Sequence, residues 1–252
     1  MKLKVIASSS SGNGYALEGR EETLLLEAGV PLSMVRKTVS DFRNIVGCLV
    51  SHIHGDHAKY IADYIKAGIP VYTNYHVWEN YDQEARKRGD WKYIAEPRFV
   101  SLVENRTKKI GEFTVMPCPA NHDVPCLGYF IHHDEIGNLA FITDSHDFAY
   151  SMSDLQHLLI EVNWSEKLLR QAVDEKRTPW FVAKRVRETH MGLHEAINYI
   201  QEEIDLEALH EIVMLHLSHE NSDPCVFTEE ITKAFQKPTF VAAEGLEIEL
   251  KR

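Results

Sequence analysis

Cysteine is scarce in this sequence, and no two cysteines form a C-x-x-C pair. The chain of 252 residues holds only Cys48, Cys118, Cys126 and Cys225. This pattern is unlike the dense cysteine spacing of small secreted domains that disulfides hold together. We therefore expect reduced thiols and a cytoplasmic protein.

Long apolar runs are also absent. No segment approaches the roughly 20 residues that a membrane-spanning helix needs, so we expect no membrane partner. The apolar stretch at the N-terminus ends at Ala7 in a serine-rich loop, which is too short for a secretory signal. A hydrophobic content of 44% over 252 residues is ordinary for a globular protein with a substantial core. We expect one domain over residues 1–252.

Basic residues are outnumbered by acidic ones. The chain has 27 Lys and Arg against 38 Asp and Glu, a formal net charge of −11. Such a balance argues against a basic surface that grips nucleic acid indiscriminately. It does not exclude a nucleic-acid substrate, because bound divalent ions would add local positive charge.

What the sequence does contain is a cluster of ligand-type side chains directly after an apolar run. Residues 45–50 predict a buried strand, and His52, His54, Asp56 and His57 follow it. Imidazole and carboxylate groups in this pattern are typical of a metal site, with donors for two adjacent ions. The alternative is a polar loop rich in histidine, which this spacing disfavours.

Further ligand-type side chains stand where other apolar runs end: Glu27, His122, Asp144, Asn163 and His216. Ligands in layered α/β folds gather at such strand ends. A single acid or histidine there also has ordinary structural explanations, so position alone leaves the role open. For Glu27 the alternatives are a hydrogen bond to a metal-ligating histidine and a solvated turn carboxylate.

Residues 52–57 match His-x-His-x-Asp-His, and on this motif the sequence resembles the metallo-β-lactamase fold superfamily. The resemblance implies an α/β fold, a four-layer αββα sandwich with two β-rich halves. It implies seven ligands in two groups: His52, His54 and His122 for one metal, Asp56, His57 and His216 for the other, and Asp144 bridging both. These nitrogen and oxygen ligands suit Zn²⁺ best, with Mn²⁺ or Fe as alternatives.

The resemblance narrows toward the nuclease and phosphodiesterase branches. His216-Leu217-Ser218 is similar to their element with the last metal ligand, and an isolated His190 precedes it. In the transfer-RNA processing branch the similar histidine assists at the scissile phosphate. Residues 3–13, 24–29 and 159–163 resemble the WalJ/YycJ group of exonucleases and their phage relatives, although Glu27 replaces the usual Asp.

These likenesses predict a dinuclear metal-dependent hydrolase, a phosphodiesterase or nuclease that acts on DNA through a metal-bridging hydroxide. Asp56 and His190 are the predicted catalytic residues. The predicted substrate contacts are Ser218, Asn221 and Asn163.

Two other functions stay open. One is a thioester or lactone hydrolase of the glyoxalase II or lactonase type, with the same metals acting on a carbonyl. The other is a metal-bound interaction module without turnover. The native metal, the choice between endonuclease and exonuclease action and the oligomeric state are not decided by the sequence.

Overall fold

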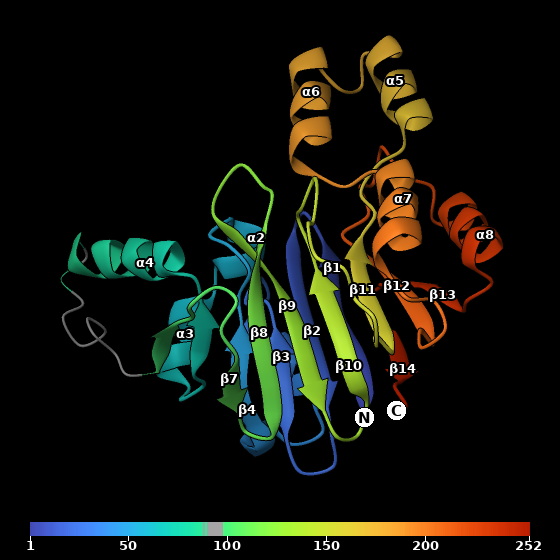
Figure 1. Cartoon of the computed structure of the whole chain (residues 1–252). Helices are drawn as coiled ribbons and strands as arrows, with labels where there is room; N and C mark the ends of the chain where they lie inside the picture. The colour runs from blue at the N-terminus through green and yellow to red at the C-terminus, as the bar shows by residue number, and fades with distance from the viewer. Residues whose placement is uncertain (88, 90–97) are drawn as a thin grey trace.

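The computed structural model describes residues 1–87, 89 and 98–252. Across these residues, two seven-stranded sheets face each other and helices cover both outer faces (Figure 1). The strand order is β14-β1-β2-β3-β4-β5-β6 in the first sheet and β13-β12-β11-β10-β9-β8-β7 in the second. The predicted αββα sandwich is confirmed.

The first sheet begins as an antiparallel meander of three strands and continues with parallel strands. Its strands are β1 Lys2–Ser9, β2 Gly12–Glu18, β3 Thr23–Leu26, β4 Ile45–Leu49, β5 Val71–Thr73, β6 Phe99–Ser101 and β14 Glu247–Glu249. The helices of this half are α1 Leu32–Thr38, α2 Gly55–Ala58, α3 Ile61–Lys66 and α4 Tyr75–Lys87, with a 3₁₀ turn at Phe42–Asn44.

The second sheet is antiparallel at one side and parallel from β10 to β13. Its strands are β7 Lys108–Ile110, β8 Phe113–Ala120, β9 Cys126–His133, β10 Gly137–Ile142, β11 His157–Glu161, β12 Glu211–Leu215 and β13 Thr239–Val241. Its helices are α5 Glu166–Asp174, α6 Trp180–Thr189, α7 Leu193–Glu203 and α8 Pro224–Phe235.

Apolar clusters fill the spaces between the four layers. Between the sheets, the rings of Tyr15 and Phe141 meet edge to face at 5.6 Å. Phe227 of α8 is buried against the second sheet, and Tyr64 of α3 against the first. Each fully buried side chain of this kind stabilises the fold by about 1.5–3 kcal/mol. This packing fixes where the strand ends lie.

Some predicted elements differ from the structure. The sequence predicts one helix over residues 58–67, but the structure has α3 at Ile61–Lys66 and, before it, the separate helix α2, which begins inside the metal motif at Gly55 and ends at Ala58. The chain bends between them because the backbone N–H of Tyr60 donates to the carbonyl of Ala28. The sequence also predicts that residues 239–243 and 246–250 together close one sheet, but β13 joins the second sheet and β14 pairs with β1 of the first.

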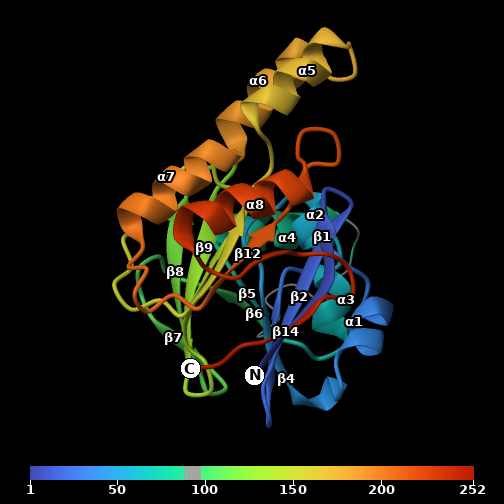
Figure 2. The ribbon, with the colours of Figure 1, turned by 90° about the vertical axis from the view of Figure 1, so that its right-hand side faces the viewer.

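Helices α5 and α6 form a hairpin that projects beyond the sheets, and we call residues 166–189 the arm (Figure 2). Its base lies at the same end of the molecule as α2 (Figure 1). Within the described part of the chain, no helix combines the length and apolar character needed to cross a membrane.

Candidate metal centre

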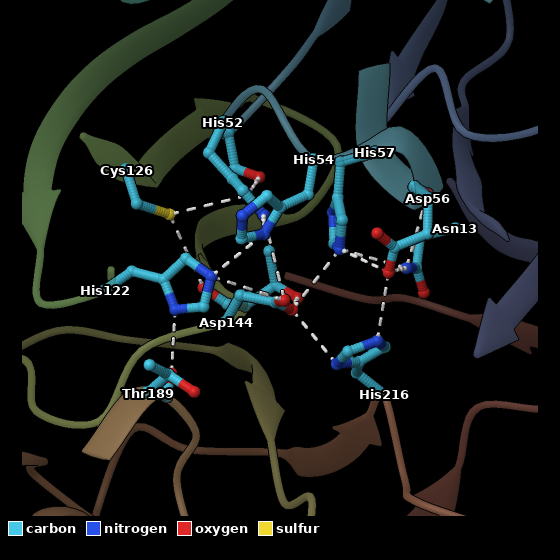
Figure 3. Close-up of polar contacts among 12 residues, drawn as sticks. Asn13, His52, His54, Asp56, His57, His122, Cys126, Asp144, Thr189 and His216 are labelled. Atoms are coloured by element: carbon cyan, nitrogen blue, oxygen red, sulfur yellow. Dashed lines mark hydrogen bonds and ion pairs between the residues drawn. The ribbon is translucent and has the colours of Figure 1, made fainter. Parts of the chain in front are cut away.

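The predicted ligands come together at one end of the two sheets, from elements far apart in the chain (Figure 3). The four motif residues come from the loop after β4 and from α2. The other three follow β8, β10 and β12, and they are His122, Asp144 and His216. Carboxyl ends of strands expose polar groups at a common edge, which explains why strand-end residues converge. Both sheets therefore contribute to the site.

The first group holds His52, His54, His122 and Asp144. The Nδ1 atom of His54 lies 3.0 Å from Nε2 of His52 and 3.2 Å from Nε2 of His122. The Asp144 Oδ2 atom is 3.8 Å from the first of these Nε2 atoms and 3.9 Å from the second. Tetrahedral ligands about 2.0–2.1 Å from zinc lie about 3.3 Å from one another. The spacing of the three nitrogens fits one metal ion.

The second group holds Asp56, His57, His216 and the same Asp144. The Asp56 Oδ2 atom is 3.2 Å from Nε2 of His57 and 3.3 Å from Nε2 of His216. The other oxygen of Asp144, Oδ1, is 3.4 Å from His57 Nε2 and 3.0 Å from His216 Nδ1. Asp144 thus turns one oxygen toward each group, as a bridging carboxylate would.

Burial and mutual attraction shift the protonation of these groups. Burial lowers the pKa of His52 well below its usual value and also lowers the pKa of His122, so both rings are neutral and able to ligate. Burial acts to raise the pKa of Asp144, but His216 and His57 outweigh it and hold that pKa well below the usual range. The ionised carboxylate therefore draws positive charge into the site.

In the second group, Nε2 of His216 is a buried ring nitrogen with no hydrogen-bond partner among the described residues, and Nε2 of His57 turns toward Asp56 and Asp144. Buried polar atoms normally find a partner, and a bound cation is one of the partners that they find. Although burial opposes it, Asp144 raises the pKa of both rings well above the usual value. The donor set fits two divalent cations, which would take the place of protons.

Several of these rings are oriented by hydrogen bonds at the ring nitrogen that faces away from the ligand groups. The Nδ1 atom of His52 lies 2.9 Å from the Ser51 hydroxyl, and Nδ1–H of His122 donates to the Thr189 carbonyl at 2.8 Å. Glu27 is buried and its Oε1 lies 3.5 Å from Nδ1 of His57, an ion-pair distance. The solvated alternative for Glu27 is therefore wrong, while its action on a metal ligand stays a prediction.

Sequence reasoning did not single out Glu161, which ends β11 inside the site. Its carboxylate accepts hydrogen bonds from the backbone N–H groups of Ser145 and Met191 at 3.0 and 3.1 Å. The Oε1 atom lies 2.6 Å from Nδ1 of His190 and 3.1 Å from Nδ1 of His216. The available signal was an acid at the end of an apolar strand, the same signal that pointed to Asp144.

Asn13 was also missed. Its side-chain Nδ2 lies 3.3 Å from Oδ2 of Asp56 and 3.1 Å from Nε2 of His57. The amide comes from β2, the middle strand of the first sheet's meander, so it holds the motif helix in place from a distant part of the chain. A serine- and glycine-rich turn around Asn13 gave no indication of this contact.

His190 is the C-cap of α6. Its ring lies 5.5 Å from the ring of His122 and 5.5 Å from that of His216. Burial opposes protonation, but Glu161 raises the pKa of His190. In the part of the chain that the structure describes, His190 forms its hydrogen bond through Nδ1 and none through Nε2, so Nε2 is free for a ligand.

The three predicted substrate contacts lie around the loop that follows β12. The Asn163 amide donates to the carbonyl of His216 at 2.8 Å. The Ser218 hydroxyl accepts a hydrogen bond from the side chain of Asn221 at 3.1 Å. The backbone N–H of Ser218 donates to the Asn163 carbonyl at 3.0 Å. These bonds hold the His216 loop, and direct contact with substrate stays a prediction. His219 is exposed and belongs to neither ligand group.

The family model of the beta-lactamase superfamily domain matches residues 25–223. The curated exodeoxyribonuclease YycJ of Bacillus anthracis is 24% identical over 259 residues, covering 98% of this chain and 94% of that protein. The metallo-β-lactamase fold protein YhfI of Bacillus subtilis has a TM-score of 0.72 at 17% identity, covering 98% of this chain and 99% of that one. The short form of human tRNase Z has a TM-score of 0.65 at 11% identity and full coverage of both chains.

At these identities the two solved structures support the fold alone, whereas the family match spans most of the chain and both ligand groups. The chain therefore belongs to the beta-lactamase superfamily, as a metal-dependent hydrolase of the metallo-β-lactamase fold.

Proposed function

We propose that this hydrolase cleaves phosphodiester bonds of DNA with two divalent metal ions, Zn²⁺ first and Mn²⁺ or Fe²⁺ as alternatives. The observation that carries the proposal is the placing of His190 beside the shared carboxylate. Its Nδ1 atom is 3.9 Å from Oδ2 of Asp144, and its Nε2 atom is uncommitted. A hydrogen-bond donor beside the two groups of metal ligands can bind an oxygen of an anionic phosphate. The likeness to a protein named exodeoxyribonuclease supports DNA as the substrate.

Two divalent ions in these groups would supply Lewis-acid stabilisation of phosphoryl oxygens and lower the pKa of a water molecule. The chain's own residues supply the proton handling. Burial opposes ionisation of Asp56, but the rings of His216 and His57, 3.3 and 3.2 Å away, lower its pKa, so it is a carboxylate at neutral pH with lone pairs for a metal ion or for a hydrogen bond from water. His190, with its Nδ1–H held by Glu161, can donate from Nε2 to a phosphate oxygen or a leaving oxygen.

The test is to purify the protein without chelator, measure its metal content, and assay bis(p-nitrophenyl) phosphate and end-labelled DNA. We expect about two metals per chain and DNA cleavage that chelator abolishes. His190→Ala should keep the metals and lower kcat by about 10²–10⁴-fold, the usual contribution of a general acid or base. His194→Ala, on the exposed side of α7, is the matched control and should leave kcat unchanged.

Two results would contradict the proposal. One is a metal-loaded protein that cleaves no phosphodiester with Zn²⁺, Mn²⁺ or Fe²⁺. Activity on a thioester or lactone in that same preparation would assign the site to carbonyl hydrolysis. The other is a protein that neither contains nor takes up metal, which would overturn the metal centre itself.

A further inference from the structure

The arm carries apolar side chains that the rest of the molecule leaves uncovered. Trp180 and Phe181, in the first turn of α6, are 70% and 61% exposed, and their rings meet edge to face at 6.3 Å. They lie at the outer end of the arm, where α5 passes into α6 (Figure 2). Large exposed aromatic side chains placed together indicate a binding surface.

The fold of the arm does not depend on these two rings. A small core of Trp164, Leu169 and Ala183 holds α5 and α6 together at its base, and neither Trp180 nor Phe181 belongs to it. The two aromatics are therefore available to a partner.

The charge of the arm is opposite to that of the remaining chain. Residues 166–189 hold seven Lys and Arg against four Asp and Glu, so the arm carries a net charge of +3 and the remainder −14. Near its outer end, Lys176 makes no ion pair with any described residue, and Lys184 pairs with Glu188 only at 3.6 Å and in the open. A basic segment on an acidic protein favours a polyanionic partner.

The arm also leads into the candidate metal centre. His190 caps the C-terminal end of α6, and its ring lies beside Asp144. Arg185 on the same helix forms an ion pair with Asp123 at 2.8 Å. Asp123 in turn lies 3.4 Å from Nε2 of His54. Ten residues of helix separate Trp180 from His190, a distance of about 15 Å at 1.5 Å per residue. A strand that keeps the stacked, duplex-like rise of about 3.4 Å per nucleotide covers that distance with about four nucleotides.

We propose that the arm binds the single-stranded part of the DNA substrate, with bases stacked on Trp180 and Phe181 and phosphates against Lys176 and Lys184. Exposed rings next to basic side chains are the standard means of holding single strands, since every base has a stackable face. This inference rests on the proposed DNA cleavage. It explains how a chain of net charge −11 captures a polyanion: a local basic arm guides the strand to the metals.

The experiment measures binding of the metal-loaded protein to a fluorescein-labelled dT12 with phosphorothioate linkages, which resist cleavage. Trp180→Ala and Phe181→Ala should each raise Kd by about 5- to 100-fold, while Trp180→Phe should stay within about threefold of the wild type. Lys176→Gln should remove one phosphate contact and so reduce the slope of log Kd against log salt concentration by about 1. Lys233 is an exposed lysine on α8, so Lys233→Gln is the control for charge and should leave both Kd and its salt dependence unchanged.

Kinetics separate capture from chemistry. On unmodified dT12, Trp180→Ala should raise KM and leave kcat within about twofold. On bis(p-nitrophenyl) phosphate, which is too small to reach the arm, both constants should be unchanged. The effect of the substitution should vanish on dinucleotides, which cannot span the arm and the metals together.

Unchanged Kd values for all arm variants would overturn the proposal and leave DNA cleavage standing. A wild type that does not bind dT12 would also overturn it. Binding that depends on Trp180 without any DNA cleavage would keep the arm and refute the proposed chemistry. A dimer that Trp180→Ala dissociates, with Kd for dT12 unchanged, would assign the two rings to a second copy of the chain and overturn the proposal.

Discussion

At the scale of single residues, the Glu161 carboxylate joins the two functions of the site. Its Oε1 atom faces both His190, which we assign to proton transfer, and His216, a proposed metal ligand. Its other oxygen, Oε2, accepts backbone N–H groups from Ser145 and Met191, so the side chain has little freedom to move. Such supporting carboxylates commonly matter almost as much as the ligands that they orient.

We predict that Glu161→Gln lowers kcat on DNA by about 10- to 100-fold, because the amide keeps the shape but loses the charge that holds the His190 ring. The measurement is kcat together with metal content. If Glu161 acts through His190, the double variant with His190→Ala should be no slower than His190→Ala alone. A kcat within twofold of the wild type in Glu161→Gln would refute this assignment.

At the scale of elements, the metal motif depends on close contact between two loops of the first sheet. Gly29 follows β3 and packs against α2, and a Cβ atom there would lie 1.7 Å from the carbonyl oxygen of Asp56. The backbone N–H of Gly29 donates to the Asn13 carbonyl at 3.0 Å, so the loop cannot move away freely. Gly55, in the motif itself, has open space where a Cβ would stand.

We predict that Gly29→Ala destabilises the protein by about 1–3 kcal/mol or more, because the new methyl group meets backbone atoms. Gly55→Ala should leave the free energy of unfolding unchanged or raise it by about 0.4–1 kcal/mol, because the substitution only restricts the conformations of the unfolded chain. Urea unfolding of both variants measures the difference. Equal midpoints would mean that the contact between the two loops is not tight.

At the scale of the whole molecule, the candidate centre exists only when both sheets are packed together. The motif residues come from the first sheet, and His122, Asp144 and His216 come from the second. The backbone N–H of His216 also donates to the hydroxyl of Ser8 at 2.9 Å, which joins the ends of β12 and β1. An ion held between the halves therefore binds the folded chain and not the unfolded one.

We predict that chelation lowers Tm by roughly 5–10 °C, since an ion at 100 times its Kd adds about 2.7 kcal/mol and each kcal/mol shifts Tm by about 2–4 °C at this size. Added Zn²⁺ should restore Tm. Asp144→Asn, which removes the shared carboxylate charge, should show a smaller response to chelator. An identical Tm of the wild type with and without chelator would speak against an ion between the sheets.

By itself, the sequence determined the candidate ligands, and its resemblance to a known family implied the layered fold. An apolar run that stops at a histidine or an acid is a local pattern, and the motif at residues 52–57 needs no knowledge of distant contacts. His122, Asp144 and His216 were found because each ends such a run, and the family resemblance grouped them.

Only the tertiary structure decided which distant groups meet. Glu161 beside His190, Asn13 beside Asp56 and Ser8 beside His216 depend on packing between residues that are 29, 43 and 208 positions apart. The local sequence does not reveal these distances, because the pattern of residues at a strand end is the same whether that end lies beside a metal site or in water. The core between the sheets chooses among these arrangements, since it alone sets which strand ends share an edge.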